Sequence, residues 1–267
     1  MTFSSVLLCL GEKFAMMSGT SMAAPHVAGV AALIKQSYPQ FTPSTISSAL
    51  STTALLNDNK GSPIMAQRTY SNPDQSLYTA TPSDMGSGFV NATAALDPGL
   101  VFDTSKYVLI LGHTTKNFIF QPKISLSYVG FEDYISFLCG INGSDTVVFN
   151  YTGFRCPANN TPVSGFDLNL PSITVSTLSG TQTFQRSMRN IAGNETYNVG
   201  WSPPYGVSMK VSPTQFSIAM GENQVLSVTL TVTKNSSSSS FGRIGLFGNT
   251  GHIVNIPVTV IAKIASS

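Results

Sequence analysis

A short stretch near the amino terminus holds a serine in a setting that could make it a nucleophile. Ser21 follows Gly19 and Thr20 and precedes a run with helical periodicity. A serine hydroxyl becomes nucleophilic when a base accepts its proton and its position is fixed. At a helix amino terminus the N–H of Ser21 could face a developing oxyanion. We take Ser21 as a candidate catalytic residue, its N–H as an oxyanion donor, and Gly19 and Thr20 as substrate-binding residues.

The elements that would position Ser21 are two helices. An apolar stripe at i, i+3, i+4 and i+7 predicts the first helix and consists of Val27, Val30, Ala31 and Ile34. Pro25 is expected in its first turn, where a missing N–H does no harm, and Tyr38-Pro39 ends it. A second helix is predicted from Thr42-Pro43, a capping residue followed by proline at the first helical position. Its apolar face consists of Ile46, Ala49 and Leu50.

The remaining chain changes from loops to strands. Residues 57–99 are rich in Gly, Pro and Asn and are predicted as loop, with short helical runs at 92–96 and 131–138. Beyond about Phe166 the hydrophobic period becomes two, as in the alternating apolar residues of 226–232 and 254–260. About seven short strands are expected between Ile173 and Ile261, which predicts a β-sandwich of immunoglobulin or fibronectin type.

Residues that could activate Ser21 are sparse. His26 lies about 140° round the same predicted helix, so the two side chains diverge and we expect His26 to be structural. The other histidines lie in glycine-flanked loops and are expected at the surface: His113 and His252. Three acidic residues are expected in turns or caps: Asp84, Asp97 and Asp103. No Cys/His cluster has zinc-ligand spacing, so we expect no metal and no cofactor.

Composition restricts the possible partners. The 267 residues suffice for two domains, and 42% hydrophobic content allows a buried core. Only 10% of residues are charged and the net charge is +2, which argues against a nucleic-acid binder. No apolar stretch approaches the roughly 18 residues of a membrane span. The apolar run Val6–Leu10 is shorter than a signal-peptide core and has no preceding basic residue.

The motif around Ser21 resembles a known family. Residues 19–29, Gly-Thr-Ser-Met-Ala-Ala-Pro-His-Val-Ala-Gly, are similar to the serine motif of the subtilase family. Segments 88–103, 133–139 and 167–173 also resemble plant subtilases, so the resemblance runs from about Leu10 over nearly the whole chain. It implies that Ser21 is the family nucleophile, that the last hundred residues or so form a fibronectin type III-like domain, and that the protein is secreted or vacuolar and glycosylated. Protein or peptide substrates are implied as well.

The departure from the family pattern is equally clear. Subtilase triads come in chain order Asp, His, Ser. No Asp-Thr-Gly or Asp-Ser-Gly segment precedes Ser21, no His-Gly-Thr-His segment is present, and the family's oxyanion asparagine is absent. The sequence resembles the carboxyl-terminal part of a subtilase, and Met1–Leu10 fits no part of the pattern. We therefore expect a partial or mispredicted gene product that is inactive alone.

The cysteines and glycosylation sequons favour an oxidising compartment. Cys9, Cys139 and Cys156 cannot all pair, and spacing alone leaves open a Cys139–Cys156 bridge or three separate thiols. Six N-x-Ser/Thr sequons are consistent with a secreted glycoprotein. They lie at Asn91, Asn142, Asn150, Asn159, Asn194 and Asn235.

The sequence thus predicts an α/β remnant of a subtilisin-like catalytic domain followed by an all-β fibronectin type III-like sandwich. The expected parts are 1–110, the peptidase portion; 111–165, a connecting segment; and 166–263, the sandwich. The expected function is that of a subtilisin-like serine endopeptidase, by resemblance. Two alternatives stay open: a non-catalytic β-sandwich glycoprotein that acts as an interaction module, and a chain that regains activity with a separately made amino-terminal half.

Overall fold

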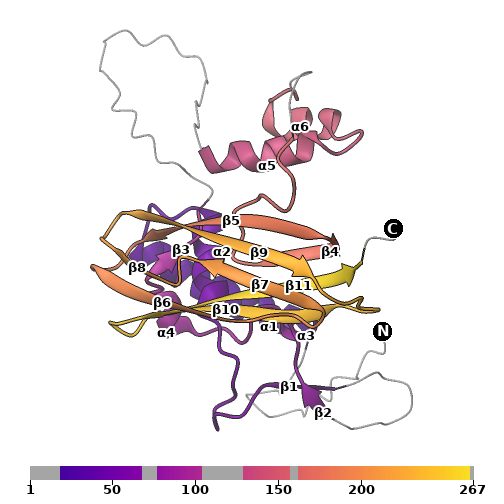
Figure 1. Ribbon diagram of the computed structural model, residues 1–267. Helices are drawn as coiled ribbons and strands as arrows, with labels where there is room; N and C mark the ends of the chain where they lie inside the picture. Colours follow the sequence, from indigo (N-terminus) through magenta and orange to yellow (C-terminus); the bar gives the residue numbers. More distant parts are fainter. Residues whose placement is uncertain (1–18, 68–76, 104–128, 157–161, 265–267) are drawn as a thin grey trace, which may run out of the picture.

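Two packed β-sheets form the centre of the computed structural model, which describes residues 19–67, 77–103, 129–156 and 162–264 (Figure 1). One sheet has five strands in the order β4-β11-β10-β6-β8, and the other has four in the order β3-β5-β9-β7. All neighbouring strands are antiparallel except β4 and β11. The strands are β3 Leu100–Val101, β4 Ile173–Ser179, β5 Thr181–Asn190, β6 Glu195–Ser202, β7 Val207–Ser212, β8 Gln215–Ile218, β9 Asn223–Val232, β10 Ser240–Gly248 and β11 Ile253–Lys263.

The sandwich core follows from alternation along the strands. In β9 the buried positions are Leu226, Val228 and Leu230, while the residues between them are more exposed. In β11, Val254, Ile256, Val258 and Val260 are fully buried. Side chains of period two enter one face of a sheet, so the two inner faces meet in a single apolar layer. The predicted sandwich is confirmed, with eight strands between 173 and 263 rather than seven.

The helical segment forms a smaller core on the outside of the sandwich. Helix α1 covers Thr20–Ser37, α2 covers Pro43–Thr52 and α4 covers Ala92–Ala95, so the three helices predicted before residue 100 are present. Their buried core consists of Ile34, Phe41, Ala49 and Ala95, with Ile191 of the sandwich packed against it. The hydroxyl of Tyr38 also donates to the carbonyl of Leu96 at 2.9 Å.

Pro25 differs from its prediction. Because α1 already begins at Thr20, Pro25 is its sixth residue and not part of the first turn. Because proline has no backbone N–H, the carbonyl of Ser21, four residues earlier, lacks its usual intrahelical donor.

The cap of α2 gives a testable result. The Thr42 hydroxyl accepts a hydrogen bond from the N–H of Thr45 at 3.1 Å. Replacing Thr42 with alanine is expected to lower the free energy of unfolding by about 1 kcal/mol, measured by urea denaturation with circular dichroism. Ser47→Ala, on the exposed side of the same helix, is the matched control and should change little. Equal effects of the two substitutions would contradict the capping role.

The described parts of 57–99 contain more regular structure than the predicted loop. They include the antiparallel pair of strands β1 Met65–Gln67 and β2 Leu77–Thr79 and the short helix α3 Pro82–Met85. Three- and four-residue elements are too short to show a periodic pattern, which is why the sequence read as loop. Asp84 caps α3, since its carboxylate accepts from the N–H and hydroxyl of Thr81. Hydrogen bonds from Tyr78 and Thr81 lower the pKa of Asp84.

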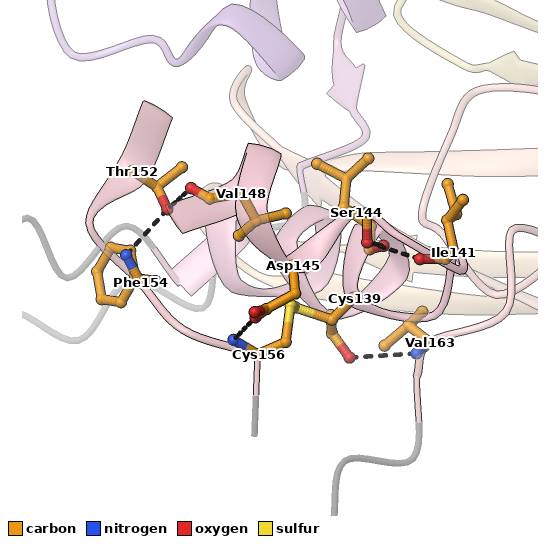
Figure 2. The surroundings of a disulfide bond; sticks show 11 residues. Cys139, Ile141, Ser144, Asp145, Val148, Thr152, Phe154, Cys156 and Val163 are labelled. Carbon is orange, nitrogen blue, oxygen red and sulfur yellow. Dashed lines mark hydrogen bonds between the residues drawn. A yellow bond between two sulfur atoms is a disulfide. The ribbon is translucent and has the colours of Figure 1, made fainter. Parts of the chain in front are cut away.

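A disulfide closes a helical hairpin that lies apart from the sandwich in Figure 1. Helix α5, Val129–Cys139, includes the helical run predicted at 131–138, whereas α6, Asp145–Thr152, was not predicted. Cys139 and Cys156 are bonded, with Cα atoms 5.4 Å apart, and the N–H of Cys156 donates to the Asp145 carboxylate at 3.0 Å (Figure 2). Of the two open arrangements, the structure has the bridge. Cys9 lies outside the described residues.

The helical segment and the sandwich share a strand. Residues 100–101, from the predicted peptidase portion, form β3 and pair with β5. Leu100 and Phe102 are fully buried in the sandwich core. The N–H of Phe102 donates to the hydroxyl of Ser48 on α2 at 2.8 Å. These contacts fix α2 against the sandwich, and α2 also packs against β11.

Candidate functional site

Ser21 is the second residue of α1 and is exposed. Gly19 precedes the helix with φ of 146°, a conformation that favours glycine. The carbonyl of Gly19 accepts from the N–H groups of Met22 and Ala23 at 3.0 and 3.1 Å, which starts the helix. The N–H of Ser21 is among the first donors of the helix, which have no intrahelical acceptor. The backbone therefore presents the hydroxyl and an N–H without an intrahelical acceptor at one helix terminus, with the exposed Gly19 and Thr20 beside them.

His26 does not serve Ser21 as a base. Its Nδ1 lies 2.6 Å from the carbonyl oxygen of Met22 on the same helix. Within residues 19–67, 77–103, 129–156 and 162–264, no hydrogen bond joins the Ser21 hydroxyl to a histidine or a carboxylate. The described site thus contains the Ser21 hydroxyl and a backbone N–H donor, and no described side chain lies in position to accept the proton of that hydroxyl. His113 lies outside the described residues.

His252 is not the surface residue that its glycine-flanked loop predicted. Its side chain is only 17% exposed. Its Nδ1 lies 2.7 Å from Oε2 of Glu195, and its Nε2 lies 3.2 Å from Oδ1 of Asp97. Asp97 lies in the turn after α4, as predicted, and its N–H donates to the carbonyl of Ala94 at 3.1 Å. Its carboxylate also forms an ion pair with His252 when the imidazole is protonated, which the sequence did not predict. The two carboxylates reach the imidazole from different parts of the chain, which sequence spacing could not reveal.

Glu195 is the centre of this cluster. Its side chain is 1% exposed. The Tyr197 hydroxyl donates to it at 2.6 Å, and Thr250 donates through its N–H at 3.0 Å and its hydroxyl at 2.5 Å. Burial alone would raise the pKa of Glu195, but these hydrogen bonds and that of His252 outweigh it and lower the pKa. Burial and the neighbouring carboxylate raise the pKa of Tyr197, which stays a neutral donor.

A groove of about 920 Å³ lies beside the cluster, between the helical segment and the outer face of the five-stranded sheet. The sheet side contributes Trp201, Arg243 and Phe247 among others. The helical side contributes residues 53–56 and also Asn91, Thr93, Ala94, Asp97 and Pro98. Nη1 of Arg243 is buried and has no hydrogen-bond partner in the described part of the chain. Burial lowers the pKa of Arg243. Ser21 does not line this groove.

The remaining predicted residues take separate places. Asp103 accepts from the Thr42 hydroxyl at 3.4 Å, and its carbonyl accepts from the Asn169 side chain at 2.9 Å. No group of three or more metal-ligating side chains occurs among the residues that the structure describes. No described helix is long and apolar enough to cross a membrane.

The sequons differ in accessibility. Asn91 caps α4 by accepting from the N–H of Ala94 at 3.2 Å and is partly buried. Asn159 lies outside the described residues. The other four are exposed: Asn142, Asn150, Asn194 and Asn235.

The fold and the Ser21 site define a class. Residues 4–88 match the family model for the subtilase family, and residues 167–260 match that for the fibronectin type-III domain. The chain is therefore a subtilase segment followed by a fibronectin type III domain. The prediction that Met1–Leu10 fits no part of the family pattern is wrong from residue 4 onward.

Particular relatives lie within the plant subtilases. The chain is 90% identical over 257 residues to Subtilisin-like protease SBT2.3 of Arabidopsis thaliana, 64% identical to SBT2.2 and 56% identical to SBT2.1 of the same organism. Each alignment covers 96% of this chain. The chain spans only 27–28% of the length of these relatives, and it corresponds to a carboxyl-terminal part of SBT2.3.

Proposed function

We propose that this chain supplies the nucleophile segment of a subtilisin-like serine endopeptidase. Ser21 attacks the substrate carbonyl, and its N–H stabilises the oxyanion. The observation that carries the proposal is the exposed Ser21 at the second position of α1, within a segment that matches the subtilase family. Gly19 and Thr20 lie beside the attacking hydroxyl and contact the peptide substrate.

The described residues of the chain are insufficient for catalysis. The hydroxyl has no base within hydrogen-bond reach among them, and His26 is bonded to its own helix. In subtilisin itself, loss of the triad serine or histidine lowers kcat by about 2 × 10⁶-fold. A base, its orienting carboxylate and a second oxyanion donor must therefore come from outside this part of the structure.

Labelling with a fluorophosphonate probe tests both the nucleophile role of Ser21 and the inactivity of the chain alone. The 267-residue chain alone should label no more than its Ser21→Ala variant. In a chimera, these residues replace the matching part of SBT2.3, which is 90% identical. This chimera should label at Ser21, because the missing groups then come from the remainder of the relative.

The controls separate a failed fold from a failed site. The unaltered SBT2.3 protein shows that the probe works, and circular dichroism verifies the folding of each variant. A folded chimera that stays unlabelled while SBT2.3 labels would overturn the assignment of Ser21. Labelling of the chain alone would instead show that a base is present within it.

A second candidate function is a non-catalytic, secreted glycoprotein that binds partners through its sandwich. The complete apolar core of the sandwich favours it, since that core needs nothing from Ser21. The exposed sequons at Asn142, Asn150, Asn194 and Asn235 would carry the glycans. An unlabelled, folded chimera would favour this alternative.

A further inference from the structure

The imidazole of His252 lies between two carboxylates from opposite sides of the junction. Glu195 begins β6 of the sandwich, whereas Asp97 follows α4 of the helical segment. Both ring nitrogens are within hydrogen-bond distance of a carboxylate, at 2.7 and 3.2 Å. A carboxylate only accepts, so both nitrogens must donate for both contacts to form. That requires the protonated imidazolium.

We propose that His252 is a proton-linked latch that holds the Asp97–Gly99 segment, and with it α4, against the sandwich. With the imidazolium present, the ring binds both carboxylates and the latch is closed. A neutral imidazole has one N–H and one lone pair. In the neutral ring the N–H stays on Nδ1 and donates to the buried Glu195. The lone pair of Nε2 then faces the Asp97 carboxylate, and the contact with the helical segment weakens.

The surroundings leave the imidazole as the group that titrates. Among the described residues, the charged and titratable groups that face it are Asp97, Glu195 and, through Glu195, Tyr197. Arg243 of β10 lines the same groove and keeps its charge. Glu195 accepts hydrogen bonds from Tyr197 and Thr250 whether or not the imidazole is charged. The exposed contact to Asp97, whose side chain is 69% exposed, is therefore the one that changes.

The His252 ring also packs directly against Gly99, at the end of the segment that the latch holds. Gly99 has φ of +69°, and a Cβ placed there would lie 2.7 Å from Cγ of His252 and 2.6 Å from the Tyr197 hydroxyl. The N–H of Ile191 donates to the carbonyl of Gly99 at 2.9 Å. Opening of the latch is therefore local to residues 94–99, while β3 stays paired with β5.

The direction of the pH dependence follows from the two pKa shifts. Burial disfavours the charged ring, but hydrogen bonds to Glu195 and Asp97 outweigh it and raise the pKa of His252 above 6.5. Its stabilisation is therefore complete below pH 6.5 and is lost as pH rises through the raised value. The lowered pKa of Glu195 preserves its contribution above pH 4.5, which is lost only as pH falls through the lowered value. The latch is closed in mildly acidic solution and opens towards alkaline pH.

Hydrogen exchange and an NMR titration of the full chain test the proposal. The His252 ring should titrate above 6.5. Protection of the backbone amides in residues 94–99, corrected for intrinsic exchange, should fall about two- to fivefold between pH 5.5 and pH 8.5, the size expected for an exposed ion pair. His252→Gln should abolish this change.

Two further variants decide the outcome. Asp97→Asn removes an exposed charge without disturbing the core, and it should lower the pKa of His252 and reduce the pH effect. His26→Gln, an exposed histidine on α1, should leave both unchanged. A His252 pKa at or below 6.5, or an unchanged pH response in His252→Gln, would overturn the proposal.

Discussion

Replacing Glu195 with alanine is expected to lower the free energy of unfolding by about 3–5 kcal/mol. The carboxylate is almost completely buried and accepts from Tyr197, Thr250 and His252. Its removal leaves these donors without an acceptor in a region that little water reaches, and the loss includes an ion pair when His252 is protonated. Urea denaturation measures the loss, with the fluorescence of the single tryptophan, Trp201, as the signal.

Conservative and exposed variants make the Glu195 result specific. Glu195→Gln keeps the size of the side chain and one acceptor oxygen but removes the charge, so an intermediate loss is expected. Glu222→Ala removes an exposed carboxylate in the turn between β8 and β9, and it should cost little beyond the hydrogen bond that Glu222 accepts from the N–H of Ala219. A loss below about 1 kcal/mol for Glu195→Ala would show that the cluster is not a buried ion pair.

Replacing Arg186 with alanine should destabilise the chain by about 3 kcal/mol, because its guanidinium is a buried structural cation. Arg186 is 2% exposed, and burial lowers its pKa to about 10. It donates to the carbonyls of Ser172, Phe166 and Gln185 at 2.8–3.3 Å. Two of these carbonyls lie in the segment before β4, so the side chain fixes that segment to β5.

Arg186→Lys tests whether the planar arrangement of the guanidinium donors matters. A lysine keeps the charge but cannot present donors in a fixed plane to several carbonyls at once, so most of the loss should remain. Lys210→Ala on β7 is the matched control, because Lys210 is an exposed cation in the same four-stranded sheet. Both variants are compared by the urea midpoint. Full stability in Arg186→Lys would show that charge alone accounts for the effect.

The sequence predicted those elements whose signals are local. Alternation in β9 and β11 fixed which side chains enter the core, and Thr42-Pro43 marked the start of α2. The strands β1, β2 and β3 have two or three residues each and carry no usable period. Tertiary contacts alone define them, as the pairing of β3 with β5 shows.

The residues of the candidate site were likewise predictable only where their signal is local in the sequence. Ser21 could be identified because its whole motif is continuous in the sequence. The His252 cluster could not, because its members lie at positions 97, 195, 197, 250 and 252 and meet only when the chain folds. One signal was available: Glu195 shares the inward face of β6 with Tyr197 and Val199. A carboxylate in that register indicates a buried charge that needs donors.

The strand β3 has a consequence for where the sandwich domain begins. Residues 167–260 match the fibronectin type-III domain, yet Leu100 and Phe102 fill part of the same core. A recombinant domain that started at Asp167 would lose these two side chains and would bare one edge of β5 near Arg189 and Asn190. Unpaired N–H and C=O groups along a strand are a template for another chain. Such a truncated domain is expected to self-associate. In the full chain β3, which comes from the peptidase portion, pairs with this edge of β5 and prevents it.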